Sequence, residues 1–67
     1  MTTKQSLYNA LEAHYKAEVA AAEATLMVYF NNAAGIGEHP QVVDEMTKQV
    51  DKLEHAKGCL EVLKDLS

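Results

Sequence analysis

The chain has 67 residues, six lysines, no arginine and a formal net charge of -4. This length allows a single domain, 1–67, near the lower size limit for a self-sufficient core, and the charge argues against nucleic acid, whose phosphates are bound by Lys and Arg. Cys59 is the only cysteine, which excludes an intramolecular disulfide, and no apolar run reaches the roughly 18 residues of a membrane span. We therefore expect a cytoplasmic protein without a membrane segment.

The first 30 residues predict one long helix, from Thr3 to Phe30. Thr2 and Gln5 have the spacing of a capping box, and the helix contains neither proline nor glycine. At about 100° per residue, one apolar face is expected to form the hairpin core and holds Leu7, Leu11, Tyr15, Ala22 and Tyr29. A polar strip on the same helix consists of Asn9, Glu12, Lys16 and Glu23.

This helix also carries a second apolar stripe, nearly opposite the first. Its members follow a 4-3-4 spacing that leads into a methionine, and they are Ala13, Ala17, Ala20, Ala24 and Met27. A helix that is apolar on two sides is usually covered on two sides. Because alanine permits the close approach of another backbone, we expect these residues to form an interface with a second chain.

Residues 31–40 predict a turn that reverses the chain. Asn31 or Asn32 can take the left-handed conformation that ends a helix, and Pro40 suits the first position of a new one. We expect Ile36, the only large apolar residue of the turn, to pack against the end of the hairpin. His39 is expected at the N-cap of the second helix.

The second helix is expected from about Pro40 to Leu66. An unbroken 4-3-4-3 spacing predicts a heptad seam with Gln49 as its polar member. The seam residues expected in the hairpin core are Val42, Met46, Leu53 and Leu60. The fold class is therefore all-α, an antiparallel two-helix hairpin, and a symmetric dimer of hairpins makes a four-helix bundle.

Glu18 is the most unusual residue, because it lies on the main apolar face one turn after His14. A carboxylate there is costly unless it is paired, so we expect a hydrogen bond with His14 or a tyrosine hydroxyl, or a side chain that reaches solvent at a gap. A slightly different helix phase, with Glu18 exposed, is one alternative. Another is a metal site built from two symmetry-related copies of His14 and Glu18.

Motifs of established catalytic chemistry are missing from the sequence. None of the seven glutamates is followed three residues later by a histidine, as di-metal bundles require, and neither His-Glu-x-x-His nor Cys-x-x-Cys occurs. Asp51 and His55 have the i,i+4 spacing of a two-ligand clip but lie away from the seam. Cys59 has no electropositive setting that would activate its thiol. We expect no enzymatic activity, no metal and no cofactor.

Three segments resemble short uncharacterised proteins of T4-like marine cyanophages. They are Ser-Leu-Tyr-Asn-Ala-Leu-Glu-Ala-His-Tyr at 6–15, Gly-Ile-Gly-Glu-His-Pro at 35–40 and Val-Asp-Lys-Leu-Glu at 50–54. The resemblance extends over nearly the whole chain, but such families have no assigned activity, so no site residue is transferred from them. It implies a viral protein in the cytoplasm of an infected bacterial cell.

The leading functional hypothesis from the sequence is a homo-oligomer, most simply a dimer, that acts as an assembly or regulatory adaptor. An acidic inhibitor or modulator of a host protein is the alternative, with an apolar patch or the Glu38-His39 turn as its contact surface. A metal-binding bundle that uses His14 and Glu18 is a further alternative.

Overall fold

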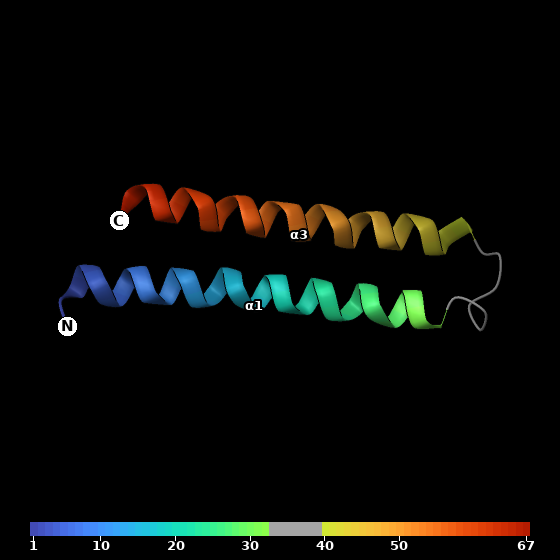
Figure 1. Cartoon of the computed structure of the whole chain (residues 1–67), viewed down its shortest axis with the longest axis horizontal. Helices are drawn as coiled ribbons and strands as arrows, with labels where there is room; N and C mark the ends of the chain where they lie inside the picture. The colour runs from blue at the N-terminus through green and yellow to red at the C-terminus, as the bar shows by residue number, and fades with distance from the viewer. Residues whose placement is uncertain (33–39) are drawn as a thin grey trace.

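The computed structural model describes residues 1–32 and 40–67. These ranges contain two helices and no strand: α1 is Thr3–Asn31 and α3 is Pro40–Leu66. The helices lie side by side and antiparallel, with both chain termini at the same end (Figure 1). We call this the open end, and we call the opposite end, where α1 stops and α3 starts, the loop end. The protein is thus an all-helical hairpin with extents of 51 × 17 × 12 Å.

Side-chain hydrogen bonds mark both ends of α1. At its start the Thr2 hydroxyl accepts a hydrogen bond from the Gln5 backbone N–H at 3.1 Å, as the capping-box spacing predicts. At its end the backbone N–H and the side-chain amide of Asn32 both donate to the Val28 carbonyl, at 3.0 and 3.1 Å. Asn32 has φ -109° and ψ 20°, so the expected left-handed ending is wrong. Its two donors satisfy a carbonyl that the helix leaves free.

Helix α3 runs without interruption from Pro40 to Leu66. Pro40 is tolerated at its first position because the N–H that proline lacks has no partner there in any helix. Gly58 does not mark a close helix contact, since a Cβ built on it meets nothing within 4 Å. The expectations for Ile36, Glu38 and His39 lie outside the described residues.

Two rows of side chains, one on each helix, form the interface between α1 and α3. We call each row a seam; every member is buried or half-buried, and each row has a continuous 4-3 spacing. The α3 seam is Val42, Met46, Gln49, Leu53, Ala56, Leu60 and Leu63. The α1 seam is Tyr8, Glu12, Tyr15, Val19, Ala22, Leu26 and Tyr29. Matching heptad rows of this kind let two helices pack along their whole length.

The α1 seam differs from the sequence expectation in its first half. Leu7 and Leu11, expected in the hairpin core, are 61% and 46% exposed, whereas Tyr8 and Glu12 are half-buried. Glu12 therefore leaves the polar strip to which the sequence assigned it. The reason is geometric: a 4-3 row that includes Tyr15 continues through positions 12 and 8, while steps of 4 and 4 through 11 and 7 drift around a helix with 3.6 residues per turn.

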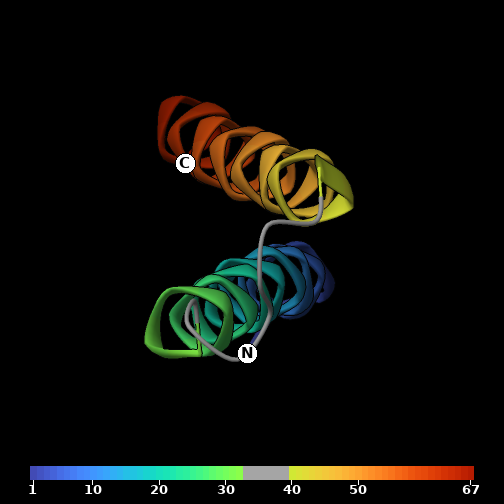
Figure 2. The ribbon, with the colours of Figure 1, turned by 90° about the vertical axis from the view of Figure 1, so that its right-hand side faces the viewer.

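The hairpin core is thin. Among the described residues, the buried ones are Ala22, Leu26, Ala56 and Leu63, and two of these are alanines. The view along the helices shows that each helix is covered on one side only, by the other helix (Figure 2). A core of this size is at the limit of what stabilises a domain alone.

Candidate functional site

Four exposed apolar side chains outside the seams lie at the open end. Leu7 and Leu11 come from the start of α1, and Val62 and Leu66, which are 57% and 68% exposed, come from the end of α3. We call these four residues the open-end corner. Between the helices a groove is lined by Leu11, Tyr15, Cys59, Val62 and Leu63, among others. Single exposed leucines are ordinary, whereas several exposed apolar side chains at one end of a hairpin make that end a candidate interaction site.

The same side of the hairpin is hollowed nearer the loop end. The hollow is lined by Glu18, Ala21, Ala22 and Thr25 of α1 and by Gln49, Asp51, Lys52 and His55 of α3. Glu18 and Thr25 follow Leu11 at intervals of seven residues, which keeps all three on one side of α1. The small side chains of Ala21, Ala22 and Thr25 leave the space open. We call the open-end corner and this hollow together the groove face.

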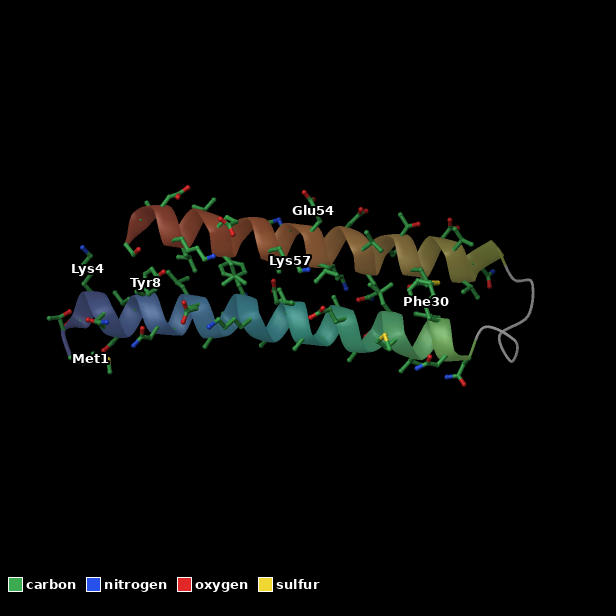
Figure 3. The ribbon with its side chains drawn as sticks, viewed as in Figure 1. Met1, Lys4, Tyr8, Phe30, Glu54 and Lys57 are labelled. Carbon is green, nitrogen blue, oxygen red and sulfur yellow. The ribbon has the colours of Figure 1, made fainter. Side chains whose placement is uncertain are left out.

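The opposite side of the hairpin, which we call the opposite face, is lined mainly by charged side chains near the open end and has exposed apolar side chains near the loop end. Near the open end it is lined by Glu12, Lys16, Glu54, Lys57, Gly58, Leu60, Glu61 and Lys64. Near the loop end it holds the exposed apolar side chains of Phe30, Val43 and Val50. Val43 and Val50 precede Lys57 and Lys64 at intervals of seven residues, so one row of α3 changes from apolar to charged along its length. Phe30 marks the loop end of α1, and Met1 and Lys4 mark its other end (Figure 3).

The alanine stripe that the sequence assigns to a partner interface lies on the outside of α1. Ala13, Ala17, Ala20, Ala24 and Met27 are all exposed. Their spacing puts them on the side of α1 that faces away from α3, as an intermolecular surface requires. Their contact with a second chain stays a prediction.

His14 and Glu18 lie in contact on the surface of α1. The Nε2 atom of His14 lies 3.2 Å from Oε1 of Glu18, and both side chains are exposed. The His14 ring also packs edge-on against Tyr15, with 5.0 Å between ring centroids. Two of the sequence-based expectations therefore hold together: Glu18 is paired with His14, and it is exposed because the seam passes beside it. An exposed pair of this kind contributes little to stability.

The candidate metal ligands do not assemble into a larger group within one hairpin. Asp51 and His55 line the same hollow. However, the described ranges contain no group of three or more His, Cys, Asp or Glu side chains that could hold a metal ion. Protein metal sites usually supply three or four ligands, so the His14 and Glu18 pair falls short of such a site by itself.

Cys59 lies between Tyr15 of α1 and His55 of α3. Its Sγ atom is 3.6 Å from Nε2 of His55. A side-chain hydrogen bond with Cys59 raises the pKa of the Tyr15 hydroxyl, and the negative charges of ionised Cys59 and of Glu18 add to the effect, because both disfavour the phenolate. The sequence analysis did not bring Cys59 and Tyr15 together, although both line the same groove. Its spacing from Ala56 and Leu63, three and four residues away, is the signal that puts it at the seam edge.

No protein-family model, curated protein or solved structure matches this chain. In residues 1–32 and 40–67, neither helix has an apolar stretch long enough to cross a bilayer. The geometry defines the class of protein, an all-helical hairpin with extensive apolar surface outside its core.

Proposed function

We propose that this chain is a non-enzymatic helical hairpin that associates with a second copy of itself, most simply as a four-helix bundle, and serves as an assembly or regulatory adaptor. The observation that carries the proposal is the amount of surface that a single hairpin leaves exposed. A four-helix bundle is the simplest arrangement that covers a second side of both helices.

The exposed area can be compared with that of a compact protein. The hairpin has a solvent-accessible surface of 5193 Å². A compact monomer of its mass, 7.4 kDa, exposes about 4200 Å². The excess is about 1000 Å², and one partner in a stable protein interface buries about 800 Å². The excess exposed area of one hairpin is therefore close to the area that one partner buries in a stable interface.

The exposed side chains support the same proposal. Besides the open-end corner, Met27, Val28 and Phe30 of α1 and Val43 and Val50 of α3 are each more than half exposed. Burial of apolar surface stabilises association by about 25 cal/mol per Å² before the costs of binding. Association with a partner adds more to the stability of a protein with few buried side chains than to that of a protein with a large core.

We further propose a cytoplasmic location, in an infected bacterial cell if the cyanophage resemblance reflects descent. The single cysteine favours a reducing compartment, where structural disulfides are rare. The resemblance would make self-assembly, or assembly with another viral protein, the setting in which the adaptor acts.

Sedimentation velocity of the untagged protein, from about 1 to 100 µM, tests the proposed self-association by mass action. We expect a species of twice 7.4 kDa that dissociates on dilution. Circular dichroism of the same samples should show a loss of helix as the dimer dissociates, because the hairpin core is thin. A fully helical 7.4 kDa monomer over this whole range would refute the proposal.

A further inference from the structure

We propose that two hairpins pack antiparallel through their groove faces, so that the open half of each copy covers the loop half of the other. This inference rests on the self-association proposed above and adds the contact surface and the orientation of the pair. Three features carry it: the size of the side chains along the groove face, the distribution of charge along the hairpin, and the composition of the opposite face.

Side-chain size changes along the groove face. Its open half presents Leu7, Leu11, Val62 and Leu66, whereas its loop half is hollow and lined on α1 by Ala21, Ala22 and Thr25. In an antiparallel pair the large side chains of one copy lie over the small ones of the other, and the two hairpins keep an even separation. A pair in the same direction would place large against large at one end and small against small at the other, which leaves a gap at the loop end.

Charge changes along the hairpin in a matching way. The open half, 1–16 and 55–67, carries four lysines and three carboxylate side chains. The loop half, 17–32 and 40–54, carries two lysines and six carboxylate side chains. Antiparallel pairing puts the acidic loop half of each copy beside the open half of the other, which has a small positive net charge. A pair in the same direction would put the two acidic halves together, which like charges disfavour.

The opposite face is a poorer surface for the same contact. An antiparallel pair on that side would lay Phe30, Val43 and Val50 of one copy over the Lys16, Lys57 and Lys64 region of the other. Six charged side chains line that region, and Lys16 and Lys64 are paired with Glu12 and Glu61 at 3.4 Å. Burial of charged side chains is costly even when they are paired. Along the groove face, by contrast, the hollow is lined by three charged side chains, Glu18, Asp51 and Lys52, and Glu18 lies 3.2 Å from His14. The groove face therefore combines apolar area with fewer charged side chains.

Distance measurements between spin labels test the orientation. The natural cysteine is first removed by Cys59→Ala, and a single label is then attached to Lys4→Cys near the open end or, as a control, to Ala17→Cys at the middle of α1. An antiparallel pair should give about 40 Å between the two Lys4→Cys labels, since some 13 residues at 1.5 Å rise separate each from the middle of the pair. A pair in the same direction should give less than about 25 Å, because packed helices lie about 10 Å apart. The Ala17→Cys distance should be similar in both arrangements.

Three glutamate substitutions test the contact surface by sedimentation equilibrium. Val62→Glu lies on the groove face, Val50→Glu on the opposite face, and Ala20→Glu on the alanine stripe; Val62 and Val50 are matched, at 57% and 51% exposed. We expect Val62→Glu to weaken the dimer at least about tenfold, because it buries a charge, and the other two to change it less than about threefold. Circular dichroism at high concentration checks that each variant is helical.

The outcomes separate the two proposals. A wild-type chain that stays monomeric overturns the proposed function and this inference together. A dimer with a short Lys4→Cys distance, or one that dissociates with Val50→Glu or Ala20→Glu and not with Val62→Glu, overturns this inference and leaves self-association standing. In the case of Ala20→Glu, the interface would be the alanine stripe predicted from the sequence.

Discussion

Tyr15 on α1 and Cys59 on α3 line the same groove between the two helices, and Cys59 raises the pKa of the Tyr15 hydroxyl. Tyr15 belongs to the α1 seam, and Cys59 lies at the edge of the α3 seam. The raised pKa therefore gives a spectroscopic signal that reports whether α1 and α3 are packed in the observed register.

The raised pKa predicts how Tyr15 responds to alkaline pH. In a Tyr8→Phe, Tyr29→Phe variant, ionisation of Tyr15 followed by absorbance at 295 nm should have a higher midpoint in the folded protein than in urea. The folded protein binds the Tyr15 proton more tightly than the unfolded chain does, so the protonated hydroxyl stabilises the folded state. This contribution is fully present below the ordinary tyrosine pKa of about 10 and is lost as the pH rises through the pKa of Tyr15 in the folded protein. Cys59→Ala should lower the folded midpoint; an unchanged midpoint would show that Cys59 is not the cause.

Replacement of Gly58 by alanine should stabilise the protein. Gly58 lies inside α3, and its Cβ position is open space. Alanine is favoured over glycine in a helix interior by about 1 kcal/mol, so Gly58→Ala should raise the free energy of unfolding by about that amount. Urea denaturation followed by circular dichroism measures this, at one fixed protein concentration because association contributes to stability. Ala17→Gly on exposed α1 should lower stability by a similar amount, and a loss of stability in Gly58→Ala would point to a contact that the hairpin alone does not contain.

Gln49 is the polar member of the α3 seam, half-buried beside the hollow that Ala22 also lines. Gln49→Leu keeps the approximate volume and removes an amide from an apolar row. We expect the free energy of unfolding to rise by about 1 kcal/mol. Gln41→Leu, at an exposed position of the same helix, is the matched control and should change stability by less than about 0.5 kcal/mol. Equal effects of the two substitutions would contradict the burial of Gln49.

The N-cap of α1 offers a local test of the helix start. Thr2→Ala removes the acceptor of the Gln5 N–H and should cost about 1 kcal/mol or less, while Thr2→Ser should retain the bond and most of the stability. Thermal unfolding followed by circular dichroism compares the two variants. If Thr2→Ser is as destabilised as Thr2→Ala, the hydroxyl is not what begins the helix.

Much of the hairpin could be derived from local sequence. The start of α1 at Thr3 follows from the threonine cap, and the start of α3 at Pro40 follows from proline at a first helical position. The end of α1 at an asparagine was also expected, although Asn32 ends it by donating two hydrogen bonds rather than by a left-handed conformation. These features depend on residues within one turn of each other, so a single stretch of sequence contains the information.

The α3 seam could be derived from the sequence as well, because that helix has one row with an unbroken 4-3-4-3 spacing. Val42, Met46, Leu53 and Leu60 all lie in it and are half-buried. The groove face could not be derived in the same way. It combines the end of α3 with the beginning of α1, and only the antiparallel register determines which residues of the two helices become neighbours.

By itself, the sequence determined that there are two helices, where they begin and end, and which row of α3 faces its neighbour. The tertiary structure alone decided the rotation of α1, which places Tyr8 and Glu12 in the seam and leaves Leu7 and Leu11 exposed. The physical reason is that α1 is apolar around most of its circumference, so its own sequence favours several orientations almost equally. The choice among them is made by packing against the single regular row of α3.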